Sequence, residues 1–255
     1  MLHVHHYGPP SGPAVLAVHG VTAHGERFAG TAAAALPGHH VLAVDLRGHG
    51  RSSNEAPWTI EQHVTDLLEV MLAYGLDRVP VMGHSYGGTI ATHLLATAPH
   101  RVERLLLLDP AIQLPGWEAA ANAVALMNDA AYPTLEALVE ARRVGRSVEA
   151  VPFSDEDARA AGDQSDYDDM WRMRYFVPAA IAGWSEMARR MPILPVAVPT
   201  LLVVAAQAGL VTDRQISHYR TQLDDALEVV TVDCGHMLYW DRFEETAALV
   251  RRFLG

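Results

Sequence analysis

The chain has 255 residues, enough for one large α/β domain with a substantial hydrophobic core, with or without an inserted subdomain. Half of the residues are hydrophobic and 19% are charged, a composition typical of a globular enzyme and not of a disordered chain. The formal net charge of −11 argues against nucleic acid or an anionic membrane as a partner, because both favour clustered Lys and Arg.

The N-terminal stretch and the cysteine content bear on the cellular compartment. MLHVHHYGPPSGP lacks a basic region followed by a long apolar run, so we expect no secretory signal. No window contains the roughly 20 apolar residues that span a bilayer. The single cysteine, Cys234, excludes an internal disulfide and suits a reducing compartment. We therefore expect a cytoplasmic protein without membrane insertion, as a monomer or a homodimer.

Short β-rich runs alternate with helical segments over the first 110 residues. The continuous apolarity of the β-rich runs suits strands that are covered on both faces, as in a parallel sheet. A short strand is expected in LHVHHY, followed by strands within 13–20, 39–48, 78–85 and 101–110. Helical spacing occupies 27–37, 59–75 and 88–99. This alternation predicts repeated βαβ units.

The pattern changes between about residues 115 and 195. β-like runs disappear, and proline punctuates helical pieces at 117–129, 134–145, 154–162, 166–176 and 179–190. Strand–helix alternation then resumes at 199–207, 212–223, 226–233 and 241–254. We predict an α/β core domain formed by 1–114 and 196–255, with a helical cap at 115–195.

The nonamer VMGHSYGGT carries the strongest chemical signal. Ser85 lies between a strand and a helix in the pattern G-x-S-x-G, where a strained turn projects the hydroxyl above the sheet and requires small neighbours. The following helix directs free N–H groups, notably that of Tyr86, towards a developing oxyanion. In LAVHGVTAHG, Gly20 allows close approach of the backbone, so that Val21 can supply a second N–H.

A serine hydroxyl needs a base, and His236 is the best candidate among fourteen histidines. It lies in a loop between the last β-run and the C-terminal helix, from which its side chain can reach over the sheet edge. His84, although adjacent to Ser85, is expected to point away into packing. His3, His5 and His6 alternate in the first strand, where half-exposed strand histidines are a simpler interpretation than a metal site.

Four ordered motifs together resemble the α/β-hydrolase superfamily: HG at 19–20, DLRGHGRS at 45–52, GHSYGG at 83–88 and DCGH at 233–236. The resemblance covers nearly the whole chain. It implies an α/β-hydrolase fold with a mostly parallel sheet of seven or eight strands flanked by helices, and a cap after the sixth strand of the family pattern. It also implies Ser85 as nucleophile, His236 as base, and Val21 and Tyr86 as oxyanion-hole donors. No cofactor and no metal are expected, and Asp45 and Arg47 more simply hold their loop.

The position of the acid, the third member of the catalytic triad, differs in this chain from its position in most members of the family. After the seventh strand, where most members carry the acid, this chain has Gly209 in LLVVAAQAGLVTD. A subset that includes haloalkane dehalogenases places the acid after the sixth strand, and there LLLLDPAI supplies Asp109. Neighbouring strands lie about 4.8 Å apart, so a carboxylate on either strand tip can approach one histidine. Asp109 is the preferred acid. Asp213, in a helix-start pattern, and the absence of a functional acid remain alternatives.

The expected cap combines aromatic and sulfur-containing side chains with an acidic cluster. The apolar set is Trp117, Trp171, Trp184, Met127, Met170, Met173, Met187 and Met191, which suits either a substrate face or the cap's own core. The acidic residues are expected to form a solvated face: Asp155, Glu156, Asp157, Asp163, Asp166, Asp168 and Asp169.

These patterns predict a serine hydrolase that cleaves a carboxylic ester with an apolar or aromatic part through an acyl-enzyme on Ser85. The same groups can instead act on a C–C bond, a thioester, a lactone or a peroxide. A receptor-like or scaffold protein with weak catalysis is the alternative from another class, and Gly209 favours it.

Overall fold

A computed structural model describes residues 1–127, 131–165 and 167–255. Its main sheet has seven strands in the spatial order β1-β3-β2-β4-β5-β8-β9. β1 runs antiparallel to β3, and the other neighbouring strands are parallel. The strands are β1 (Val4–Tyr7), β2 (Ala14–Val18), β3 (His40–Val44), β4 (Val79–His84), β5 (Val102–Leu108), β8 (Thr200–Ala205) and β9 (Leu227–Val232). The predicted α/β-hydrolase sheet is confirmed with seven strands.

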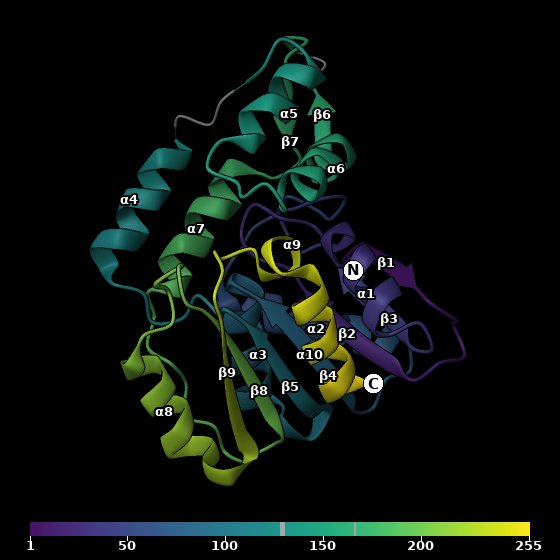
Figure 1. The fold of residues 1–255 in the computed structure, drawn as a ribbon, viewed down its shortest axis with the longest axis vertical. Coiled ribbons are helices and arrows are strands. Elements are labelled where there is room, and N and C mark those ends of the chain that lie inside the picture. The colour runs from purple at the N-terminus through teal and green to yellow at the C-terminus, as the bar shows by residue number, and fades with distance from the viewer. Residues whose placement is uncertain (128–130, 166) are drawn as a thin grey trace.

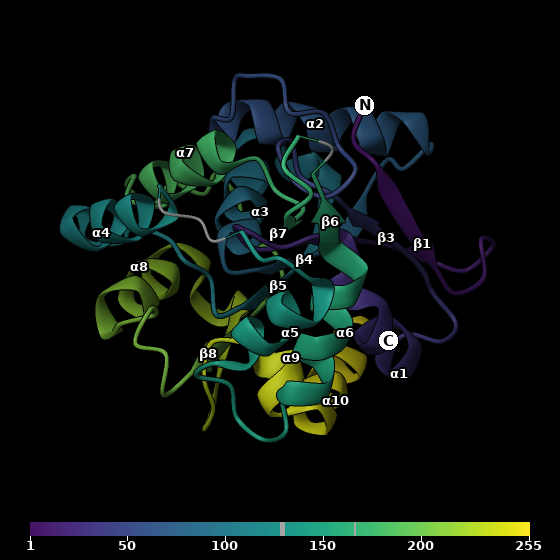
Figure 2. The ribbon, with the colours of Figure 1, turned by 90° about the horizontal axis from the view of Figure 1, so that it is seen from above.

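Helices cover both faces of this sheet (Figures 1 and 2). Alternate residues of β2 face opposite cores: Leu16 and Val18 lie in one apolar cluster, Val15 and Ala17 in the other. This two-sided burial explains why the strands read as continuous apolar runs. The helices of the core are α1 (Ala29–Ala35), α2 (Ile60–Ala73), α3 (Tyr86–Thr97), α8 (Asp213–Leu223), α9 (Leu238–Asp241) and α10 (Phe243–Leu254). The short 3₁₀ segments are η1 (Gly25–Phe28), η2 (Pro99–Arg101) and η3 (Asp224–Ala226).

The chain leaves the sheet after β5 and returns at β8. This stretch, residues 109–199, is called the insertion below, and in Figure 1 it rises above the end of the sheet where β4 and β5 finish. It contains α4 (Gly116–Leu126), α5 (Leu135–Arg143), α6 (Val151–Ala161) and α7 (Val177–Met187). A two-stranded hairpin, β6 (Gly162–Gln164) with β7 (Trp171–Met173), separates α6 from α7.

Two expectations for the insertion are wrong. The helix expected over 166–176 is absent from residues 167–176, which instead contain a turn and β7. Trp171 pairs with Gln164 there and bridges to Tyr132, so tertiary pairing overrides helical spacing. The acidic cluster is not wholly solvated either, because Asp157 is buried against Arg27 and His24. Asp166 lies outside the described residues, as do the last two positions of the helix expected over 117–129.

No helix within the described ranges is long and apolar enough to cross a membrane.

Candidate active site

Ser85 occupies the sharp turn between β4 and α3. Its backbone has φ +54° and ψ −121°, a conformation that is costly for a residue with a side chain and that lifts the hydroxyl above the sheet. A Cβ on Gly83 would lie 2.5 Å from the Gly87 carbonyl oxygen, and a Cβ on Gly87 would lie 2.0 Å from that of Val18. Both glycines are therefore required by the turn, as the G-x-S-x-G pattern predicted.

Hydrogen bonds from two sides hold this turn in place. The Ser85 N–H donates to the carbonyl of Leu108 at 3.1 Å, and the Ser85 carbonyl accepts from the N–H groups of Gly88 and Ala111. The Thr89 hydroxyl donates to the Ala111 carbonyl at 2.5 Å. The turn of Ser85 is therefore tied to the segment that follows β5, on which Asp109 lies.

His236 and Asp109 are in direct contact. The two atoms His236 Nδ1 and Asp109 Oδ2 are 2.6 Å apart, and the second carboxylate oxygen of Asp109 accepts the N–H of Ala205 at 3.1 Å. The Asp109 side chain is fully buried, whereas that of His236 is 31% exposed. A buried carboxylate on Nδ1 fixes the orientation of the imidazole and leaves Nε2 as its other ring nitrogen.

The sheet register explains why Asp109 can reach this position. His84 pairs with Leu108, and Leu108 pairs with Val203, so β4 and β5 end level with Val203, two residues before the end of β8. Asp109 is the first residue beyond β5 and has φ +43°. It turns at that point while its N–H donates to the Val203 carbonyl at 2.8 Å. The carboxylate of Asp109 follows β5, which is one strand nearer to Ser85 than β8 is. It therefore reaches the loop that carries His236.

The other candidate acid lies elsewhere. Asp213 is exposed in the first turn of α8, behind the N-cap residue Thr212, whose capping box with Gln215 confirms the helix start read from the sequence. Gly209 has φ +70° in the preceding loop, and a Cβ there would meet nothing within 4 Å. Asp213 therefore belongs to the start of α8. The carboxylate in contact with His236 is that of Asp109.

Two main-chain N–H groups without a protein acceptor indicate a candidate oxyanion site. Among the described residues, neither the Val21 N–H nor the Tyr86 N–H donates to a protein acceptor. Gly20 brings the first of these loops against the nucleophile, because a Cβ at this position would lie 2.9 Å from Ser85 Cβ and 3.3 Å from its Oγ. Unpaired N–H groups beside a nucleophile are what an oxyanion hole requires.

His84 has a role that the sequence did not reveal. Its Nε2 donates to the main-chain carbonyl of His236 at 2.9 Å, and its Nδ1 accepts from the Tyr239 hydroxyl at 3.2 Å. Burial, and then the nearby His236, lower the pKa of His84 well below its usual value, so the ring stays neutral. His84 thus fixes the loop that carries His236. No local motif connects residues that are 152 positions apart.

Asp45 and Arg47 hold their loop, as expected. Asp45 accepts the N–H groups of Gly25 and Arg51 and a hydrogen bond from His5, and Arg47 forms a bidentate pair with Asp66. Burial disfavours the charge of Asp45, but the bond from His5, the nearby His19 and the N–H groups of Arg51 and Gly25 together outweigh it and hold the pKa of Asp45 well below its usual range. The ligand atoms of His3, His5 and Asp45 lie within 4.8 Å of one another. The carboxylate oxygens of Asp45 already accept hydrogen bonds from protein groups.

α7 of the insertion packs close to the residues that flank Ser85. A Cβ on Gly183 of α7 would lie 3.3 Å from the Tyr86 ring and 3.4 Å from the Val21 side chain, and Ser85 is only 6% exposed. Apolar residues of the insertion fall into three groups. Met187, Trp184 and Met191 pack on the main core, and Met173 and Trp171 form a small core with α5 and α6. Trp117, Val124 and Met127 on or directly after α4 are exposed.

The fold combines a serine in a strand–turn–helix position with a histidine–aspartate pair from the loops that follow β9 and β5. The chain belongs to the α/β hydrolase fold family, whose model matches residues 13–243. Lipase LipV of Mycobacterium tuberculosis is 38% identical over 261 aligned positions, covering 100% of this chain and 98% of that protein. N-formylmaleamate deformylase of Pseudomonas putida is 28% identical and covers 85% of this chain and 80% of the relative. A marine microorganism esterase structure has a TM-score of 0.82 at 19% identity, with 99% of each chain covered, and shows the shared fold.

Proposed function

We propose that the protein is a serine hydrolase that cleaves carboxylic esters with an apolar or aromatic part through an acyl-enzyme on Ser85. The observation that carries this proposal is the 2.6 Å contact between His236 and the buried Asp109, together with the strained turn of Ser85. The full-length identity of 38% to a protein named a lipase supports the carboxylic ester hydrolase class.

Each group has a step in the reaction. His236 Nε2 takes the Ser85 proton as Oγ attacks the ester carbonyl, and Asp109 stabilises the imidazolium through Nδ1. The N–H groups of Val21 and Tyr86 receive the oxyanion of the tetrahedral intermediate. The C–O bond to the alcohol breaks as His236 returns the proton to the leaving oxygen. Water, deprotonated by His236, then attacks the acyl-enzyme and releases the acid and free Ser85.

The apolar side chains of the insertion support an apolar substrate. α7 packs against the segments that flank Ser85, and the side chains of Trp117, Val124 and Met127 are exposed on or directly after α4, which lies beside α7 in Figure 1. Exposed apolar patches of this kind mark contact with apolar ligands or surfaces. We therefore assign the insertion the role of a cap over Ser85.

A panel of p-nitrophenyl esters of increasing chain length tests the proposal, with Ser85→Ala and the wild type assayed side by side. Turnover that rises with chain length and disappears in Ser85→Ala supports it. An aromatic β-diketone and a formamide belong in the same panel, because the same groups can act on C–C and C–N bonds and one relative is named a deformylase. Turnover of either of these with no ester hydrolysis would contradict the ester assignment.

The catalytically weak alternative loses its main support. It rested on the missing carboxylate at Gly209, whereas His236 has a carboxylate partner in Asp109.

A further inference from the structure

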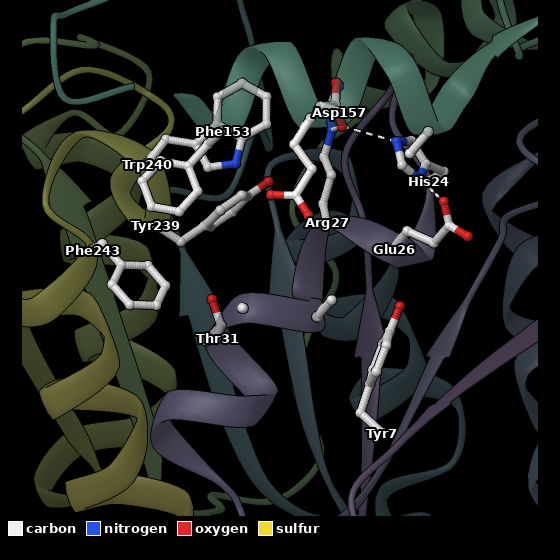
Figure 3. A pocket seen from close by; sticks show the side chains of 14 residues that line it. Tyr7, His24, Glu26, Arg27, Thr31, Phe153, Asp157, Tyr239, Trp240 and Phe243 are labelled. Carbon is white, nitrogen blue, oxygen red and sulfur yellow. Dashed lines mark hydrogen bonds and ion pairs between the residues drawn. The ribbon is translucent and has the colours of Figure 1, made fainter. Parts of the chain in front are cut away.

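A cavity of about 420 Å³ lies between the insertion and the core. Its walls come from η1, α1 and β1 on one side, α6 of the insertion on another, and α9 with the start of α10 on the third (Figure 3). Neither Ser85, Asp109 nor His236 lines it. The volume falls within the range of small-molecule sites, about 300–1,000 Å³.

The two ends of the cavity differ in chemistry. Phe153, Trp240 and Phe243 gather at one end in Figure 3, and the rings of Phe153 and Phe243 stack with centroids 5.3 Å apart. Glu26 and the Tyr7 hydroxyl lie at the opposite end. An occupant that fits both ends has a hydrocarbon group and a polar group.

The charge of the lining selects the sign of that polar group. Three carboxylates, Glu26, Asp157 and Glu156, line the cavity against one guanidinium, Arg27. Asp157 already neutralises Arg27 through two bonds of 2.6 and 2.8 Å. The lining is therefore negative whether or not His24 is protonated. A cation placed beside Glu26 and Glu156 is attracted by these carboxylates. Two guanidinium groups lie just behind the lining: that of Arg51, 3.6 Å from Glu26, and that of Arg146, over the Trp240 ring.

Two lining carboxylates have unused capacity. Glu156 is exposed and has no ion pair within the described part of the chain. The ion pairs of Glu26 with Arg51, His5 and His24 are long, between 3.6 and 3.8 Å, and its side chain is 30% exposed. Burial, and then Glu26, raise the pKa of Tyr7, so the phenol stays neutral and can donate a hydrogen bond or offer its ring to a cation.

We propose that this cavity binds a small organic cation that carries an aromatic or branched hydrocarbon group. The hydrocarbon lies against Phe153 and Phe243, and the ammonium lies beside Glu26 and Tyr7. Because Phe153 belongs to the insertion and Phe243 to the core, the occupant contacts both parts of the chain.

Binding of benzyltrimethylammonium, measured by isothermal titration calorimetry, tests the proposal, with phenylacetate as the anionic comparison. We expect saturable binding of the cation and at least tenfold weaker binding of phenylacetate. Gly30 is exposed on α1, and its added Cβ would lie 3.4 Å from the Phe243 ring, so Gly30→Leu should fill the cavity and weaken binding at least tenfold. Gly38→Leu is the matched control, because Gly38 is exposed and has nothing within 4 Å.

Charge is tested separately. Glu26→Gln should weaken binding about tenfold, equivalent to about 1.4 kcal/mol. Glu55→Gln should leave the affinity unchanged. Arg47 donates a hydrogen bond to the main-chain carbonyl of Glu55, which this substitution does not alter. Thermal unfolding of each variant verifies that it is folded. Absence of saturable binding to the wild type, equal affinity in Gly30→Leu, or equal affinity for phenylacetate would overturn the proposal.

Discussion

The Nδ1 atom of His236 lies 2.6 Å from the carboxylate of Asp109, a residue that follows β5 and not β8. The carboxylate is fully buried and also accepts the N–H of Ala205. The strand next to the nucleophile strand therefore supplies the partner of the histidine, and the loop around Gly209 after β8 does not.

The first prediction separates the two candidate acids. Asp109→Asn should lower kcat by about 10⁴-fold, because an amide cannot stabilise the imidazolium and favours the wrong tautomer. Asp213→Asn should change kcat by less than about twofold, since surface substitutions have small effects. Steady-state hydrolysis of a p-nitrophenyl ester measures both. A large loss in Asp213→Asn together with an active Asp109→Asn would discard the assignment.

The second prediction concerns the close approach at Gly20. In Gly20→Ala the new methyl would lie 2.9 Å from Ser85 Cβ, so the serine or the oxyanion loop must move. A misplacement of about 1 Å at a reacting group costs roughly 10²-fold in rate, and a loss of that order in kcat is expected. Gly38→Ala, whose methyl meets nothing within 4 Å, is the control. Equal rates in the two variants would show that Gly20 has no special role.

The third prediction tests the ion pair between α6 and η1. Asp157→Ala leaves Arg27 buried without its partner, and loss of one partner of a buried pair costs about 3–5 kcal/mol. The free energy of unfolding in urea measures this cost. Asp155→Ala breaks an exposed pair with Arg143 and should change the urea midpoint much less. Similar urea midpoints for the two variants would mean that the buried pair of Asp157 and Arg27 does not stabilise the folded protein.

The fourth prediction is a pH dependence of stability. Burial raises the pKa of Asp157, but the charge of Arg27 and the bond from His24 outweigh it and hold the pKa well below its usual range. Asp157 therefore contributes stability above its unfolded pKa of about 3.9, and this contribution is lost as the pH falls further. The free energy of unfolding should decline below about pH 4 by up to about 1.4 kcal/mol per pH unit from this group. Asp157→Asn should show a shallower acid slope, and an unchanged slope would contradict the linkage.

Much of the fold was predictable because its signals are local. Two-sided burial makes each parallel strand a continuous apolar run. The helix that follows Thr59 begins with a capping pattern that spans only the four residues from Thr59 to Gln62. The turn around Ser85 is equally local, since Gly83 and Gly87 are required by its own backbone. These features needed no knowledge of distant residues.

Other features depend on contacts between distant segments. The hairpin of β6 and β7 has helical spacing in the sequence, and only its pairing shows that it is a hairpin. The bond from His84 to the His236 carbonyl and the buried pair of Asp157 with Arg27 join segments more than 100 positions apart. A resemblance to relatives suggested Asp109, but its contact with His236 follows from the register of β4, β5 and β8.

The most direct measurement of the central claim is labelling with a fluorophosphonate, followed by intact mass and peptide mapping. The account predicts one adduct per chain, located on Ser85 and absent from Ser85→Ala. It also predicts that labelling is slowed by orders of magnitude in Asp109→Asn and is unchanged in Asp213→Asn. A chain that stays unlabelled, or that is labelled at a residue other than Ser85, would contradict it.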